Sequence, residues 1–338
     1  MTFIGATKAM KQLLLQQPKK STILNKQSVV KYSIIIISYE NFPETTGQLL
    51  NYLLPSQSKY EAEVILFDNG STAVTLRQIK LLTETDERLK VICNHENLGF
   101  AGGNNQAFTY TSGEVVIFLN SDTITTFPVL DRLIDEMSQV EATVIGPISN
   151  QVSGVQKIKI FTSDVQQILN EGEFINNSDV SLEPFETDCL SFFCIAIKRD
   201  IYSLLNGLDE GYEMGYYEDA DFCFRARKAG MKLHCTERVF VYHKGEGSFA
   251  NVSIKSTILK NKKRFKKHHK GVKSRKVRIE NLDRIRFYKK QLKEGQGSPG
   301  PILDFLFSRR FGLTAEYKPK SFLTGLMHEI KSWTILKE

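Results

Sequence analysis

An acidic cluster and a histidine, close together in the sequence, are the residues best suited to chemistry. Glu218, Asp219 and Asp221 open a helical pattern that runs to Gly230, and the strand pattern that follows ends at His243. A carboxylate can act as a general base, and an imidazole can bind a metal ion. Their combination predicts an enzyme. We expect the helix N-terminus to keep the acids ionised at neutral pH.

The composition predicts one large domain with appendages. The chain has 338 residues, 41% of them hydrophobic, which is enough for a full α/β core. We expect no transmembrane helix, because no run approaches the ~20 apolar residues that cross a bilayer, and no signal peptide. The five cysteines are scattered, as expected of reduced core residues in a cytoplasmic protein.

Apolar runs alternate with helical patterns in the first part of the chain. The runs cover 33–38, 64–67, 89–93 and 115–119, and the helical patterns lie near 43–54, 74–83 and 102–111. This alternation predicts an α/β fold with a parallel sheet. After a loose polar stretch at 150–186, a further apolar strand is expected at 190–198.

Polar residues follow these runs, at the edge where ligands bind to such a sheet. They include Ser38, Tyr39 and Glu40 after the first run, Asp68 after the second, Asn97 after the third, and Asn120, Ser121 and Asp122 after the fourth. Carboxylates there can hold a nucleotide base and a divalent ion, with a diphosphate as the third component. Taken singly, the residues around Asp68 also fit a turn, and those before Asp122 a helix cap.

A glycine-rich stretch at 99–104 lacks the G-x-G-x-x-G spacing of a dinucleotide-binding fold, and it follows the third strand instead of the first. Its glycines would let the backbone approach a nucleotide at a helix start. Gly99 and Asn104 therefore join the expected nucleotide-binding residues.

The net charge of +7 is concentrated in one segment. Lys260 to Arg278 contains eleven Lys or Arg residues and no Asp or Glu. Phe265 is the one aromatic residue within it, which argues against nucleic-acid binding. An anionic membrane surface is the favoured partner, and a solvated tail is the alternative.

Residues 32–249 resemble family 2 glycosyltransferases of the GT-A fold, especially their bacterial rhamnosyltransferase-like and galactofuranosyltransferase-like branches. The motifs that carry the resemblance lie in order at 33–39, 64–71, 97–104, 118–122, 207–210, 218–230 and 241–243. The resemblance implies a mostly parallel central sheet flanked by helices.

The resemblance also divides the chain. We expect an N-terminal arm at 1–30, a GT-A catalytic domain at 31–250, and a basic, mainly helical extension at 251–338. Within the domain, 31–122 would bind the nucleotide and 123–250 the acceptor.

The resemblance implies that Asp68 binds a pyrimidine base. It places Asn120, Ser121 and Asp122 at the family's D-x-D motif, from which Asn120 departs. Asp122 and His243 would then be the protein ligands of Mg²⁺ or Mn²⁺, together with the diphosphate.

The choice of general base falls on Asp219, the second acid of the family's Glu-Asp pair. Helical spacing favours it too, because it shares a stripe with Phe222, Cys223 and Ala226. Glu218 is then expected to position the acceptor sugar. Asp221 is the third choice, since it lies four residues before Arg225, the favourable spacing for a helix ion pair.

The expected activity is inverting, metal-assisted transfer from dTDP-rhamnose or a UDP-sugar to a cell-surface glycan or lipid-linked oligosaccharide, in the cytoplasm or at the inner membrane face. One alternative is a sugar nucleotidyltransferase, but residues 38–41 do not offer its basic, glycine-rich phosphate loop. The other is a non-catalytic glycan-binding relative, against which the retained Asp219 and His243 count.

Overall fold

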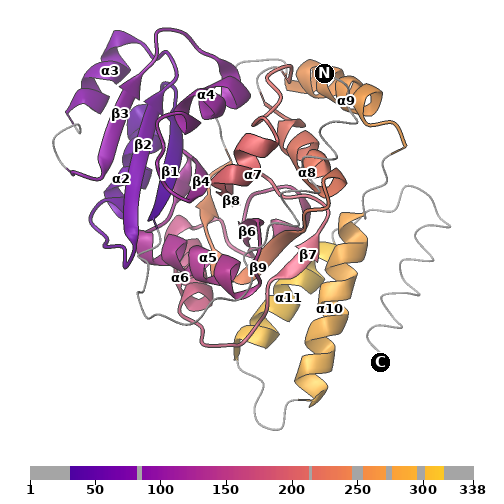
Figure 1. Ribbon diagram of the computed structural model, residues 1–338. Coiled ribbons are helices and arrows are strands. Elements are labelled where there is room, and N and C mark those ends of the chain that lie inside the picture. The colour runs from indigo at the N-terminus through magenta and orange to yellow at the C-terminus, as the bar shows by residue number, and fades with distance from the viewer. Residues whose placement is uncertain are drawn as a thin grey trace, which may run out of the picture.

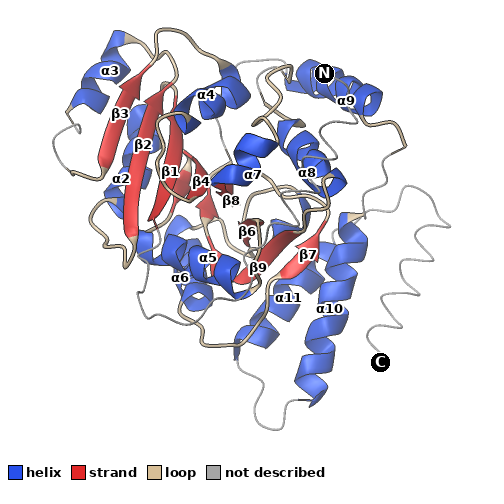
Figure 2. Ribbon diagram, in the orientation of Figure 1, coloured by secondary structure: helices blue, strands red, loops and turns tan. Residues whose placement is uncertain are grey.

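A central eight-stranded sheet with helices on both faces forms the fold (Figures 1 and 2). The computed structural model describes residues 31–81, 86–212, 215–245, 254–271, 276–294 and 301–315. The expected N-terminal arm at 1–30 lies outside the described residues. Within them, no helix is both long and apolar enough to cross a bilayer.

The sheet combines parallel and antiparallel pairings. Its strands are β1 (Lys31–Ser38), β2 (Glu61–Asp68), β3 (Leu89–Cys93), β4 (Val115–Asn120), β6 (Val144–Ile148), β7 (Phe185–Thr187), β8 (Cys194–Lys198) and β9 (Leu233–Phe240), in the spatial order β3-β2-β1-β4-β8-β6-β9-β7. Four of the seven pairings between these strands are parallel, and the antiparallel ones all involve β7 or β8. The predicted α/β fold with a mostly parallel sheet is confirmed.

Each face of the sheet is covered by its own helices. Ile34 and Ile36 of β1 pack in one core cluster with α2 (Thr46–Leu53), α3 (Ala73–Lys80) and α5 (Phe127–Gln139). Ile35 packs in the other, with α4 (Gly99–Phe108), α6 (Val165–Asn176), α7 (Arg199–Leu204), α8 (Glu218–Lys228), α10 (Val277–Glu294) and α11 (Pro301–Ala315). Successive strand residues point to opposite faces, so β1 is buried on both sides, as its continuous apolar run predicts.

Two sequence-based assignments differ from the structure. The polar stretch at 150–186 contains α6, whose first turn is capped by the Asp164 side chain accepting from Gln167 N. The strand expected from residue 190 begins at Cys194, and the segment before it is a loop with buried apolar side chains. Burial alone therefore made that loop resemble a strand.

Strand register brings the expected ligand-binding residues to one edge. Ser38 pairs with Asp68, and Ile37 pairs with Asn120. Because β1, β2 and β4 are parallel, their carboxyl ends meet at this edge. A separate ladder of β5 (Thr123–Ile124) and β10 (Tyr242–His243) adds His243 opposite Thr123.

The C-terminal helices are fastened to the sheet by buried charges. Glu237 of β9 is 2% exposed and accepts from Nε of Arg284 on α10 at 2.9 Å and from Nε of Arg310 on α11 at 2.8 Å. Burial alone would raise the pKa of Glu237, but the charges of the two arginines outweigh it and lower the pKa to about 2. The described part of 251–338 is helical, as predicted, and the boundary at residue 250 stays a prediction.

We expect Glu237→Gln to lower the free energy of unfolding by about 3–5 kcal/mol, because it leaves Arg284 and Arg310 buried without a counter-charge. Denaturant unfolding followed by circular dichroism measures this. Glu186→Gln is the control, since it breaks an exposed ion pair with Lys232, just before β9, worth about 0–1 kcal/mol. Equal losses in the two variants would contradict the role given to Glu237.

Candidate active site

Asp68 ends β2 and is fully buried at the floor of the sheet edge. Its Oδ2 accepts from Ser71 N at 3.1 Å, whereas Oδ1 is buried without a hydrogen-bond partner among the described residues. Leaving such an oxygen unpaired is costly, so an unpaired one indicates a missing donor. Gly70, with φ at +82°, lets this turn pack closely, because a Cβ there would lie 2.5 Å from the Glu96 carbonyl carbon.

Asn69, which the sequence analysis did not select, shapes the loop beside Asp68. Its Nδ2 donates to Asn97 Oδ1 and to Gly99 O, both at 3.1 Å, and its Oδ1 accepts from Leu98 N at 3.0 Å. Asn97 and Gly99 thus lie at the predicted edge, held at the start of α4. Asn104 also lies on α4, where its buried amide donates back to a carbonyl of the same helix.

The residues after β1 lie next to this loop, but their side chains already have structural contacts. Ser38 is fully buried, and Tyr39 is half-buried. Glu40 accepts from Thr72 N at 2.7 Å and from Thr75 Oγ1 at 2.8 Å, so its carboxylate stabilises the start of α3. A nucleotide-binding role for these three residues stays a prediction.

Asp122 and His243, 121 residues apart in the sequence, are brought together by the β5–β10 ladder. His243 Nε2 lies 3.1 Å from Asp122 Oδ1, and Asp122 Oδ2 is buried without a partner in the part of the chain that the structure describes. The Asn150 side chain holds the backbone of His243 through two hydrogen bonds of 2.9 Å. Its Oδ1 accepts from His243 N, and its Nδ2 donates to His243 O. No local pattern in the sequence singles out Asn150.

The tautomer of His243 follows from its contacts. Nδ1 lies 2.5 Å from Gln151 O, and a carbonyl can only accept, so Nδ1 carries the proton. In the neutral ring Nε2 then presents a lone pair to Asp122, with Asn120 Nδ2 at 3.5 Å able to donate to it. Two lone pairs 3.1 Å apart require a cation or a second proton between them.

A divalent ion fits this pair. One carboxylate and one imidazole suit Mn²⁺ or Mg²⁺ if oxygen atoms of a bound phosphate complete the coordination. The described residues contain no group of three or more His, Cys, Asp or Glu side chains that could hold a metal ion. Asp122 and His243 would therefore bind the ion together with oxygen atoms of the bound phosphate. The hydrogen bond from His243 Nδ1 to Gln151 O orients the imidazole for metal binding.

Glu218 and Asp219, at the start of α8, have different environments. Glu218 is buried, and its Oε2 has no partner among the described residues. Burial together with the charge of Asp219 raises the pKa of Glu218 to about 8. Asp219 is half-buried and accepts from Ala220 N at 2.7 Å, and burial raises its pKa to about 6. The expectation that the helix N-terminus keeps both acids ionised is wrong for Glu218, because desolvation outweighs the helix dipole. The higher pKa of Glu218 favours a state at neutral pH in which the pair shares one proton, held by Glu218, and Asp219 is ionised.

Asp221 forms the predicted ion pair with Arg225, Oδ2 to Nε at 2.7 Å. Its Oδ1 lies 2.6 Å from Nε2 of His269, a residue of the basic segment that the sequence did not connect to this helix. Phe222 and Ala226 are fully buried, as their shared stripe predicts.

The loop before β8 links α8 to the Asp122–His243 pair. Leu190 N donates to Cys223 Sγ on α8 at 3.3 Å. Phe193 stacks on His243 with ring centroids 5.4 Å apart, and its carbonyl accepts from Asn120 N at 2.8 Å. The two parts of the expected site therefore share one buried support.

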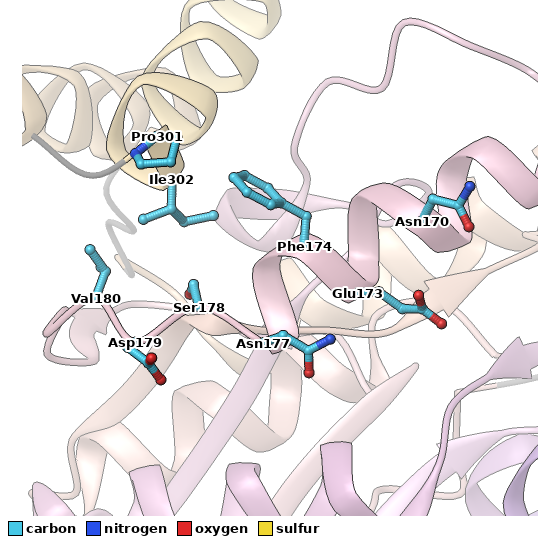
Figure 3. A pocket seen from close by; sticks show the side chains of 9 residues that line it. All are labelled: Asn170, Glu173, Phe174, Asn177, Ser178, Asp179, Val180, Pro301 and Ile302. Carbon is cyan, nitrogen blue, oxygen red and sulfur yellow. The ribbon is translucent and has the colours of Figure 1, made fainter.

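A separate hollow of about 700 Å³ lies between the end of α6 and the start of α11 (Figure 3). Phe174 and Ile302 point toward each other across it. The residues that line it are Asn170, Glu173, Phe174, Asn177, Ser178, Asp179, Val180, Pro301 and Ile302. None of the expected site residues is among them.

The chain matches a family model, several curated relatives and solved structures. The Glycosyl transferase family 2 model matches residues 33–204. The O-antigen biosynthesis protein RfbC of Myxococcus xanthus is 25% identical over 221 residues, which are 62% of this chain and 17% of RfbC. WfgD of Escherichia coli, a UDP-Glc:alpha-D-GlcNAc-diphosphoundecaprenol beta-1,3-glucosyltransferase, is 35% identical over 92 residues, which are 27% of this chain and 35% of WfgD. The chain therefore spans well under two thirds of the length of either relative.

The crystal structure of GalNAc-T7 with UDP, GalNAc and Mn²⁺ superposes with a TM-score of 0.55. The sequences are 16% identical, and the match covers 86% of this chain and 59% of that chain. At this identity the likeness concerns the fold, and it confirms the GT-A fold that the sequence predicts.

We expect Asp122→Ala and His243→Ala each to weaken Mn²⁺ binding in the presence of UDP by about 10-fold or more, because each removes one of two protein ligands. Isothermal titration with Mn²⁺ measures this. Asn120→Asp should strengthen binding by adding a carboxylate beside the pair. Glu96→Ala, at an exposed acid of the same sheet edge, is the control. Unchanged affinity in both ligand variants would contradict the metal site.

Proposed function

Because the chain belongs to glycosyl transferase family 2, we propose that it is an inverting glycosyltransferase that moves a sugar from a nucleotide-diphosphate donor to a hydroxyl of a cell-surface glycan or lipid-linked oligosaccharide. One observation supports this most. Of the four carboxylate oxygens that are buried without a partner among the described residues, three, Asp68 Oδ1, Asp122 Oδ2 and Glu218 Oε2, belong to residues expected to bind the donor, the metal ion or the acceptor. The fourth is Oε2 of Glu171, whose Oε1 pairs with Arg309. The unmet hydrogen-bonding capacity of this edge suits a polar, charged ligand.

The proposed donor is dTDP-rhamnose or a UDP-sugar. Thymine and uracil both carry an N3–H group that can donate to Asp68 Oδ1. The loop that Asn69 holds at the start of α4 would carry Asn97 and Gly99 toward the nucleotide. The neighbouring GalNAc-T7 structure contains UDP, which supports a pyrimidine nucleotide. A thermal-shift screen of nucleotide sugars identifies the donor.

In the proposed reaction Asp219 acts as the general base. It takes the proton of the acceptor hydroxyl while that oxygen bonds to the anomeric carbon of the donor sugar. On the opposite side, the bond from the anomeric carbon to the diphosphate oxygen breaks, so the configuration inverts and the nucleoside diphosphate leaves. Glu218, protonated at neutral pH, can donate to a sugar hydroxyl and hold the acceptor.

Asp122 and His243 would hold a divalent ion, Mg²⁺ or Mn²⁺, which when bound supplies positive charge for the leaving diphosphate. Asn120 replaces the first acid of D-x-D, but the two expected ligands, Asp122 and His243, are both retained. Metal dependence is therefore part of the proposal.

The two alternatives fit less well. A sugar nucleotidyltransferase needs a basic phosphate loop after β1, but the residues there are Ser38, Tyr39, Glu40 and Asn41, and the Glu40 carboxylate is already bonded to the start of α3. A non-catalytic glycan-binding relative would not need a buried Glu-Asp pair that shares one proton, since keeping it costs stability.

We expect Asp219→Asn to lower hydrolysis of UDP-glucose or dTDP-rhamnose, whichever stabilises the protein, by ~10²-fold or more, since water then has no base. Nucleotide binding should be unchanged. The wild-type rate should fall about tenfold per pH unit below pH 6, because the pKa of Asp219, raised to about 6 by burial, sets the pH at which the base is protonated.

Asp200→Asn is the matched control for this test. Asp200 also opens a helix and accepts from the next backbone N–H, Ile201 N at 2.8 Å, but it is exposed. Its rate and pH profile should equal those of the wild type. Wild-type turnover by Asp219→Asn would refute Asp219 as the base.

The basic face of α9 (Ile254–His268) is proposed to bind an anionic membrane surface, on the cytoplasmic side where nucleotide sugars are made available. The lysines on this face are exposed: Lys262, Lys263, Lys266, Lys267 and Lys270. No acid lies between residues 254 and 271. Phe265 packs 5.7 Å from the Tyr217 ring, so it is not available to stack on nucleic-acid bases.

We expect the variant with these five lysines changed to Gln to lose at least 10-fold in affinity for phosphatidylglycerol vesicles at low salt, because each lysine near an anionic surface contributes about 1 kcal/mol. Co-sedimentation measures this, with phosphatidylcholine vesicles as the control. Equal binding of variant and wild type would contradict the proposal, as would preferential binding of wild type to single-stranded DNA.

A further inference from the structure

The backbone just before the catalytic pair is unusual. Gly215, Tyr216 and Tyr217 all have positive φ, at 95°, 72° and 79°. Glycine adopts this conformation freely, but for other residues it is strained. Two tyrosines in succession hold it immediately before Glu218. Such a conformation persists where surrounding contacts impose it.

Asn261 of α9 supplies those contacts. It is 1% exposed, and its Nδ2 donates to Gly215 O at 2.9 Å and to Tyr216 O at 3.0 Å. Both N–H groups of the amide are thus committed to the carbonyls of the left-handed turn. Phe265, four residues further along α9, packs against the ring of Tyr217. The face of α9 opposite the lysines therefore fits this turn.

Two further contacts hold α9 against the residues before and after the left-handed turn. Arg264 binds Asp209 through two nitrogen–oxygen contacts, at 3.0 Å and 2.9 Å. His269, just after α9, lies 2.6 Å from Asp221 Oδ1 within α8. Figure 1 shows α9 lying beside α8. Asn261 precedes both anchors in the sequence, and the carbonyls that it contacts, at 215 and 216, lie between their partners Asp209 and Asp221.

We propose that Asn261 is a positioning residue for the transfer reaction, which holds the left-handed turn at 215–217 and so directs Glu218 and Asp219 toward the acceptor. This rests on the proposed function, in which Asp219 is the base. The basic segment then has two faces with two tasks. Its lysines face outward, and the opposite face, with Asn261, supports the active site. This face lies beyond residue 204 in the sequence, where the match to the family model ends.

The test is Asn261→Asp, which keeps the size of the side chain but removes both N–H donors and sets carboxylate oxygens against two carbonyls. We expect kcat for hydrolysis of the nucleotide sugar to fall about 10-fold or more, since small displacements of catalytic groups cost this much. KM for the donor and the affinity for UDP should stay within about twofold, because the nucleotide edge is built from β1, β2 and α4. Asn261→Ala removes the donors without adding a charge, and it provides the answer if the Asp variant does not fold.

Arg309→Gln is the matched control. Arg309 also anchors the C-terminal helices to the rest of the protein, through a 2.7 Å ion pair between α11 and Glu171 of α6. This variant should lower the melting temperature and leave kcat unchanged. A common fall of kcat in both variants would mean that Asn261 only stabilises the fold, and the proposal would be overturned.

The outcomes also separate this proposal from the assignment of the base. If Asp219→Asn is inactive and Asn261→Asp has wild-type kcat, the positioning role is wrong and the base stands. If Asp219→Asn is active, the base assignment itself is wrong. A kcat defect with unchanged donor KM in both Asn261 variants, absent from Arg309→Gln, supports the positioning role.

Discussion

A buried carboxylate oxygen without a hydrogen-bond donor is the constraint on which this site depends. Desolvation makes such an oxygen expensive, and a fold tolerates it where the surrounding backbone is held rigidly enough to prevent its collapse into another contact. Here the backbone around each of the three acids is fixed by the side-chain amide of an asparagine. These pairs are Asp68 with Asn69, Asp122 with Asn150 through His243, and Glu218 with Asn261. An amide can donate and accept at once, so one side chain can fix a loop without adding charge beside the acid.

The C-terminal segment is part of the same structure and not an attachment to it. Arg284 and Arg310 reach Glu237 inside the core, while Arg264 reaches Asp209 and His269 reaches Asp221 in the first turn of α8. Buried ion pairs contribute little net stability compared with apolar contacts, but breaking one is costly. They therefore fix where the helices dock more than how tightly they are held. The basic segment meets the domain through specific acidic partners, Asp209 for Arg264 and Asp221 for His269, while the lysines on its opposite side stay exposed.

The sequence predicted the parts of the fold that depend on local patterns. Continuous apolar runs located β1 and β4, and the four-residue spacing of Asp221 and Arg225 predicted their ion pair, because these signals lie within a few residues. The pairing of Asp122 with His243 came from the family resemblance, since no spacing connects residues 121 positions apart. The contacts of Asn261 could not be predicted at all. Asparagine in a lysine-rich helix looks solvent-exposed, and only the tertiary fold shows which carbonyls it meets.

The fully buried arginine at position 310 also bears on how the protein is made. Its side chain donates to the backbone of residues 155 and 157 and to a carboxylate 73 residues earlier in the chain. During synthesis the strands β1 to β4 can pair once Asn120 has left the ribosome, because all four lie within the first 120 residues. Glu237 of β9 stays without its ion-pair partners until Arg284 and Arg310 have been translated. Folding of the second half of the sheet is therefore expected to finish late, and a chain that stops short of this helix would leave the ribosome with a charged, half-assembled core exposed to aggregation and proteolysis.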